Sequence, residues 1–268
     1  MHLRIREYPM NRLRAIIAAF LQEWKTSAGI ANYLAQLSGI VVRSAALAWI
    51  VRQSGDQALL TYLYVGIPLI SIWFWVVFQV GWSLSNELSG RTLDFNVISR
   101  TPVLLMMLGK TLTHVAYWIP AGIISFVTVL LVTGQLPEMA DIRILPFSLL
   151  LVIVGLAVTS LIFAPLVLLV GGAGGFFNAI MPIGAVLSGF ILPVGRLPFG
   201  LEIVARCLPA SWAMESIWLG IEGTESWWPV VSAWSMSILL SVVWLGIAYI
   251  MCNAVEKRIR ITGTLGIY

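Results

Sequence analysis

The chain has 268 residues, of which 59% are hydrophobic and only 10% are charged, and its formal net charge is +4. Soluble domains carry about 45–50% apolar and about 25% charged residues, so this composition excludes a single water-soluble core. The apolar runs are continuous, which favours helices over the alternating strands of a β-barrel. We therefore predict an all-α membrane protein, folded as one transmembrane domain over residues 1–268.

The first predicted element is an amphipathic helix within residues 1–28. Apolar residues such as Leu13, Ile17 and Trp24 recur at helical spacing, with charged residues around them. This pattern is typical of a helix that lies in the membrane interface. The alternative is that the segment extends the first membrane span.

Six apolar stretches are predicted to be membrane spans, since about 20 apolar residues cross a bilayer. They cover about residues 33–51, 62–84, 103–132, 147–170, 176–192 and 228–252, and the fifth is short.

Arg43 lies near the middle of the first predicted span, where a charged side chain is costly. It must therefore face other helices, a water-filled cavity or a partner chain. A role in a transport pathway or subunit interface and a purely structural role both remain open.

The polar stretch of residues 85–102 separates the second and third predicted spans. On a helix, Glu87 and Asp94 share a face and Arg91 lies between them. Thr101-Pro102 is a helix-breaking pair. We expect a short surface helix here, through which a cytosolic partner could move both neighbouring spans.

Residues 108–111 superficially suggest a nucleotide site, because they read Leu-Gly-Lys-Thr. A phosphate-binding P-loop needs a glycine five residues before the Gly of the Gly-Lys-Thr run, and Leu104 stands there. We find no catalytic motif either, and the two cysteines and two histidines do not suggest a metal site. No catalytic residue, metal ligand or cofactor site is predicted on this chain.

Residues 193–223 are too polar and too interrupted by proline to form a span, yet too apolar for a free loop. Two short helices, at about residues 199–207 and 212–219, are predicted to re-enter the membrane. Such segments are tolerated only where protein or a water-filled cavity surrounds them.

The distribution of Lys and Arg predicts the orientation. With six spans and both termini in the cytosol, eleven basic residues lie inside and four outside. Residues 85–102 are then cytosolic and residues 193–223 are external. The anionic inner leaflet accounts for the net positive charge, and no nucleic-acid partner is indicated.

The order of these elements resembles the membrane subunit of ABC-2-type exporters. Two groups of motifs carry the resemblance: Glu87-Leu-Ser-Gly-Arg-Thr-Leu-Asp94 with Thr101-Pro102 and Leu108-Gly109-Lys110, and then Leu197-Pro198 with Leu208-Pro209-Ala-Ser-Trp212-Ala-Met-Glu215. Arg91 and Asp94 depart from the Gly and Glu that are commoner in the family.

The resemblance implies a permease subunit in the bacterial inner membrane that exports a drug, lipid, polyketide or polysaccharide. Its partners would be two ATPase subunits, which hold ATP and Mg, and a second permease subunit that forms a homodimer or heterodimer. Residues implied in coupling to the ATPase are Glu87, Gly90, Arg91, Thr92, Leu93 and Asp94. Residues implied in an outer gate are Pro198, Pro209, Trp212 and Glu215.

Two other classes of function are weighed against this one. A secondary transporter or channel without an ATPase partner usually shows internal repeats, and the two halves of this chain show none. A membrane-embedded enzyme or a passive assembly factor is the third possibility, and the sequence shows no polar catalytic cluster.

Overall fold

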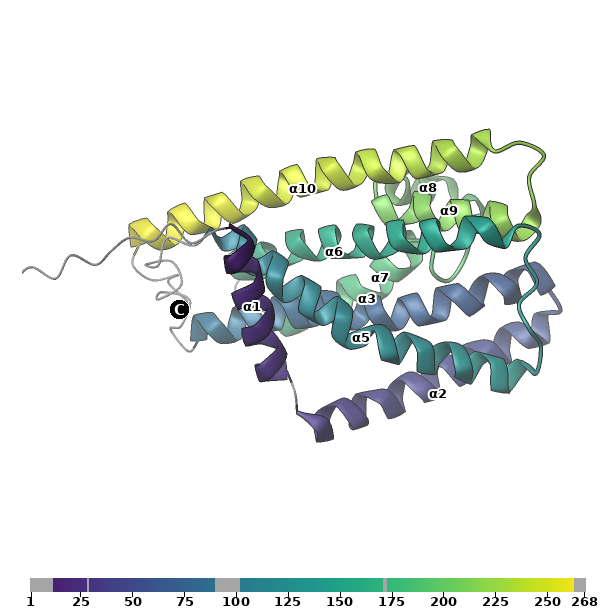
Figure 1. Ribbon diagram of the computed structural model, residues 1–268, viewed down its shortest axis with the longest axis horizontal. Coiled ribbons are helices and arrows are strands. Elements are labelled where there is room, and N and C mark those ends of the chain that lie inside the picture. Colours follow the sequence, from purple (N-terminus) through teal and green to yellow (C-terminus); the bar gives the residue numbers. More distant parts are fainter. Residues whose placement is uncertain (1–11, 28, 90–101, 171–172, 263–268) are drawn as a thin grey trace, which may run out of the picture.

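The computed structural model describes residues 12–27, 29–89, 102–170 and 173–262, and its elements in these ranges are helical. Long helices run side by side along the molecule, and α1 lies across one end (Figure 1). The elements are α1 (Arg12–Ser27), α2 (Ile30–Ser54), α3 (Gln57–Ser89), α5 (Val103–Thr133), η1 (Ile142–Ile144), α6 (Leu145–Val170), α7 (Ala173–Leu187), η2 (Val194–Arg196), α8 (Phe199–Ala205), α9 (Pro209–Glu222) and α10 (Trp228–Thr262).

The two ends of the bundle differ. The end of α3, the start of α5 and the end of α10 lie near α1, and we name this the α1 end (Figure 1). The connections at residues 55–56, 134–141 and 223–227 lie at the opposite end, which we name the far end.

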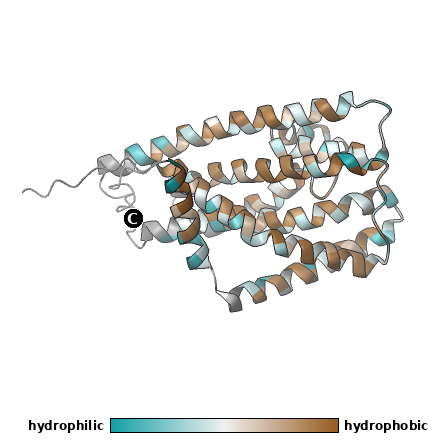
Figure 2. Cartoon of the chain, viewed as in Figure 1, coloured by the Kyte–Doolittle hydropathy of each residue, from teal (hydrophilic) through white to brown (hydrophobic). Residues whose placement is uncertain are grey.

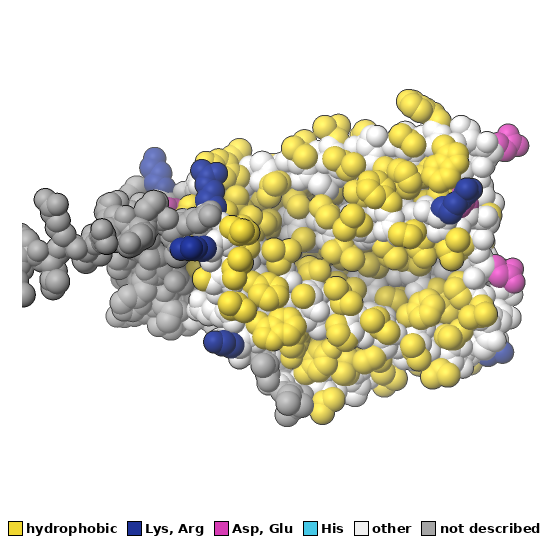
Figure 3. Space-filling model, in the orientation of Figure 1, with side chains coloured by type: hydrophobic (Ala, Val, Ile, Leu, Met, Phe, Trp, Pro, Cys, Tyr) yellow, Lys and Arg dark blue, Asp and Glu magenta, His cyan; other side chains and the backbone are white. Residues whose placement is uncertain are grey.

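Five helices among the described residues are long and apolar enough to cross a membrane. They lie at Tyr33–Ser54, Gln57–Ser83, Val103–Thr133, Ile142–Phe163 and Trp228–Lys257. Hydrophobic residues occupy most of the length of these helices, and hydrophilic residues are more frequent toward the two ends of the bundle (Figure 2). The outer surface in Figure 3 is likewise a broad apolar belt. The described residues therefore form an all-helical fold, and these five helices match five of the predicted spans in length and composition.

The predicted fifth span corresponds to α7, which is shorter than expected. α7 has 15 residues and is thus about 22 Å long, against about 30 Å of hydrocarbon in a bilayer. Gly189, with φ of 80°, turns the chain just after α7, and the Tyr62 hydroxyl donates to its carbonyl. The count of six spans therefore stays a prediction.

The segment from η2 to α9 starts and finishes at the far end. Arg196 of η2 forms an ion pair of 3.0 Å with Asp56, in the connection between α2 and α3. At the other end of the segment, the Asp141 amide donates to the Gly220 carbonyl at 2.9 Å. Both ends of the segment are thus held to far-end connections.

Between these ends, the turn from α8 to α9 lies partway along α10, away from the far end. Trp244 Nε1 donates to the Cys207 carbonyl at 2.9 Å, and Ser237 Oγ donates to the Pro209 carbonyl at 2.9 Å. Ser237 and Trp244 are about 14 and 24 Å along α10 from Trp228, at 1.5 Å per residue. The chain therefore runs away from the far end through α8 and back toward it through α9. Both helices lie near the ranges predicted for two short helices.

Candidate functional site

The predicted coupling segment starts inside α3. This helix continues to Ser89, beyond the predicted end of the second span at residue 84. Glu87 thus belongs to the last turns of α3, at the α1 end, and does not start a separate short helix as expected. No proline follows Pro68 within α3, and Gly81 lies inside the helix without ending it. The other predicted coupling residues, Gly90, Arg91, Thr92, Leu93 and Asp94, lie outside the described residues.

At the same end, α1 packs against α5 at backbone distance. A Cβ atom on Gly109 of α5 would lie 2.5 Å from the Ile16 carbonyl oxygen and 2.7 Å from the Ala19 Cβ. Only glycine allows this approach. Thr113 Oγ1, one turn further along α5, donates to the Phe20 carbonyl at 3.0 Å.

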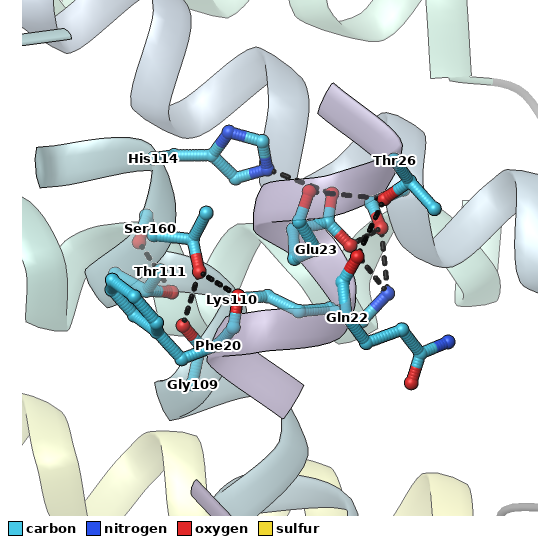
Figure 4. A network of polar contacts seen from close by, with 11 residues as sticks. Phe20, Gln22, Glu23, Thr26, Gly109, Lys110, Thr111, His114 and Ser160 are labelled. Carbon is cyan, nitrogen blue, oxygen red and sulfur yellow. Dashed lines mark hydrogen bonds and ion pairs between the residues drawn. The ribbon is translucent and has the colours of Figure 1, made fainter. Parts of the chain in front are cut away.

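A buried polar network joins α1 to α5 and α3 (Figure 4). Glu23 of α1 accepts at Oε1 from His114 Nε2 at 3.0 Å and pairs at Oε2 with Lys110 Nζ at 3.1 Å. Ser83 of α3 donates to Glu23 Oε2 at 2.8 Å and receives a hydrogen bond of 2.6 Å from Lys110 Nζ. Glu23 is 6% exposed, and Lys110 and His114 are each 2% exposed. We name these four residues the Glu23 network.

The Glu23 network keeps its carboxylate ionised. Burial alone would raise the pKa of Glu23, but the hydrogen bond from His114 and the charges of Lys110 and His114 lower it from 4.5 to about 2. The pKa of Glu23 is lower in the folded than in the unfolded state, where it is about 4.5. Its ionised form therefore stabilises the folded state, and this contribution is complete at pH values above about 4.5. This contribution is lost as the pH falls from there toward about 2.

The sequence alone did not predict this network. Lys110 was interpreted as one of the eleven cytosolic basic residues, and His114 was given no partner. One signal was present: Lys110 and His114 are four residues apart, so they share a face of an otherwise apolar helix. Their partner Glu23 is 87 residues before Lys110 in the sequence, and no local pattern connects the two.

Gly109 offers a direct test of the contact between α1 and α5. We expect Gly109→Leu to move α1 away and to cost about 1–3 kcal/mol, as overpacking of a close contact does. Limited trypsin digestion should then cut faster at Arg14 and Lys25. Gly246→Leu is the matched control, since a Cβ at this helical glycine meets nothing within 4 Å. Equal cleavage of the two variants would contradict the close contact.

Arg43 faces another helix of the same chain. It is half-buried on α2, and its guanidinium carbon lies 5.1 Å from the centre of the Phe74 ring of α3. Its Nη1 atom is buried and has no hydrogen-bond partner among the residues that the structure describes. The cation–π contact is one way of accommodating a charge at this depth. A role at a pathway or a subunit interface stays a prediction.

Two of the predicted outer-gate residues, Trp212 and Glu215, contact Arg206, which was not predicted from the sequence. The Arg206 guanidinium lies 4.6 Å from the centre of the Trp212 ring, and its Nη1 is 3.4 Å from Glu215 Oε2. Trp212 Nε1 donates to the Arg206 carbonyl at 2.9 Å. The other two, Pro198 and Pro209, stand at the starts of α8 and α9, where proline is well tolerated.

Comparison with known proteins adds one finding. The family model of ABC-2 family transporter proteins matches residues 9–250. A comparison with curated proteins gives no match.

Proposed function

The chain belongs to the ABC-2 family of transporter proteins, and we propose that it is a permease subunit that exports a substrate across the bacterial inner membrane. Separate ATPase subunits hydrolyse the ATP. The observation that carries this proposal is the family match over most of the chain, together with five helices able to cross a membrane.

The proposal places the α1 end in the cytosol and the far end outside. Basic side chains gather where the apolar belt meets the α1 end, whereas the far end shows both acidic and basic ones (Figure 3). An excess of Lys and Arg marks the cytosolic side of membrane proteins. In this orientation α7 completes a sixth span, and α8 and α9 re-enter from outside. Both termini are then cytosolic.

The α1 end is where the ATPase subunits act in this proposal. Two ATPase subunits, with ATP and Mg, contact residues 87–94 of this chain and of a second permease subunit. In the described part of this region, the Glu23 network and the Gly109 contact hold α1 to α5. A push on the connection between α3 and α5 therefore moves α1 together with both spans. At the other end, Pro198, Pro209, Trp212 and Glu215 form the outer gate.

Cysteine labelling tests the orientation. In a variant that lacks Cys207 and Cys252, we expect Leu136→Cys to react in intact cells with a thiol reagent that cannot cross membranes. Leu136 is 75% exposed in the far-end connection between α5 and α6. Lys257→Cys, exposed near the α1 end of α10, should react only after the cells are opened. The reverse pattern would contradict the proposed orientation.

Purification from the native membrane tests the partnership. We expect the tagged chain, extracted in mild detergent, to carry an ATPase subunit in equal amount, with Mg-dependent ATP hydrolysis. A chain that sustains export in vesicles without any ATPase subunit would refute the proposal.

A further inference from the structure

A small cavity lies beside the Glu23 network, lined by residues of α1, α2, α3 and α5. Its volume is about 20 Å³, and a buried site needs about 10–15 Å³ to hold one water molecule. Every side chain that lines it carries a polar atom. Three of these residues belong to α5, and the others are Ser27 of α1, Tyr33 and Gln36 of α2, and Gln79 of α3. A cavity with this lining favours a polar occupant over an apolar one.

His114 lines the cavity and has one ring nitrogen without a partner. Its Nε2 bonds to Glu23, and its Nδ1 lies on the side of the ring away from that carboxylate (Figure 4). The side chain is 2% exposed, and Nδ1 has no hydrogen-bond partner among the residues that the structure describes. In the neutral ring, a proton on Nε2 leaves Nδ1 as an acceptor. A buried acceptor of this kind requires a donor, and the cavity is where one can reach it.

Trp118, one turn further along α5, brings an unpartnered donor to the same cavity. It is 2% exposed, and its Nε1 atom likewise has no partner in the described part of the chain. Its ring stacks on Trp75 with the centroids 4.7 Å apart, and the Tyr33 ring lies 5.2 Å away. These contacts hold the indole in place, and an indole N–H can only donate.

These two atoms define the chemistry of the occupant. A cation cannot accept from the indole N–H of Trp118, and an anion cannot donate to Nδ1 of His114 and would lie near the carboxylate of Glu23. Only a molecule that both donates and accepts a hydrogen bond satisfies both atoms. The volume of the cavity limits that molecule to the size of water.

We propose that this cavity is a binding site for one water molecule, which accepts a hydrogen bond from Trp118 Nε1 and donates one to His114 Nδ1. The water selects the tautomer of His114 that donates to Glu23, so it positions a member of the Glu23 network. Tyr33 and Gln36 place polar groups of α2 around the same water. The site therefore extends the network from α1, α3 and α5 to α2, and it does not depend on the proposed function.

Nitrogen NMR of histidine tests the site on the full-length chain in lipid bilayers. The sequence has two histidines, so His2→Gln leaves His114 as the only one to carry a ¹⁵N,¹³C label. Spectra are recorded at about pH 8, above the ordinary histidine pKa of about 6.5. We expect a protonated Nε2, an unprotonated Nδ1 whose shift shows an accepted hydrogen bond, and transfer of magnetisation from water to the ring. A proton on Nδ1, or an Nδ1 without a hydrogen bond, would overturn the proposal.

Variants that fill the cavity separate water from a protein donor. We expect Ser27→Leu and Gln79→Phe, which add bulk to the lining, to move the Nδ1 signal to that of a nitrogen without an accepted hydrogen bond. Thr26→Leu is the matched control, because Thr26 is exposed and does not line the cavity, and its Nδ1 signal should match that of the parent chain. An Nδ1 signal that neither filling variant changes would assign the hydrogen bond to a group of the protein and would refute the water site.

Discussion

Replacing Glu23 with leucine is expected to destabilise the protein by on the order of 3 kcal/mol and to release α1 from α5. The variant removes the carboxylate that lies 3.1 Å from Lys110 Nζ and 3.0 Å from His114 Nε2. Lys110 is 2% exposed, and the loss of a carboxylate next to a buried charge is costly. Thermal unfolding in detergent should show a lower midpoint, and trypsin should cut α1 faster.

The double variant Glu23→Leu, Lys110→Met separates the charge effect from a packing defect. Replacing both members of a buried ion pair with apolar side chains is often neutral or stabilising. We therefore expect the double variant to recover most of the lost stability, with Glu23→Gln between it and the single variant. If Glu23→Leu unfolds at the wild-type temperature, the Glu23 network does not hold α1.

Reversing the charges of Glu87 and Asp94 together, or placing proline at Thr92, is expected to abolish the stimulation of ATP hydrolysis by substrate. A single surface ion pair is worth about 0–1 kcal/mol, so one reversal should weaken docking only modestly. Proline inside a helix costs about 3 kcal/mol or more, so Thr92→Pro should break a coupling helix. The ATPase site lies on another subunit in this account, so basal hydrolysis should persist.

The control for these variants is charge reversal at the far end. Glu138→Lys and Glu225→Lys alter exposed acidic residues there and should leave coupling unchanged. All the variants should still insert and dimerise. If the double reversal and Thr92→Pro keep wild-type pull-down of the ATPase and wild-type stimulation, residues 85–102 do not couple to the ATPase.

The long membrane helices were predictable because their signal is local. A run of some twenty apolar residues marks a span wherever it occurs, so α2, α3, α5, α6 and α10 lie near their predicted positions. The length of α7 was harder to predict, because its apolar character continues past the helix end. Just after α7 the chain turns at Gly189, which has a positive φ. The Gly189 carbonyl accepts a hydrogen bond from Tyr62, which is 127 residues away.

The polar contacts could not be predicted, because they depend on how distant segments pack. The sequence placed Trp212 and Glu215 in one outer segment, yet it did not show that both meet Arg206. It indicated an amphipathic helix within residues 1–28, yet not that the buried face of α1 contains Glu23. A helix in lipid can turn its apolar side outward, so amphipathicity alone does not say which face packs on the protein.

The most direct test of the account is ATP hydrolysis and transport in vesicles that hold the chain with and without its co-purified ATPase subunit. The account predicts that substrate accumulates only when the ATPase subunit and Mg-ATP are both present, and that the chain accelerates ATP hydrolysis. Transport by the chain alone, driven by an ion gradient and indifferent to ATP, would contradict it and would instead indicate a secondary transporter or channel.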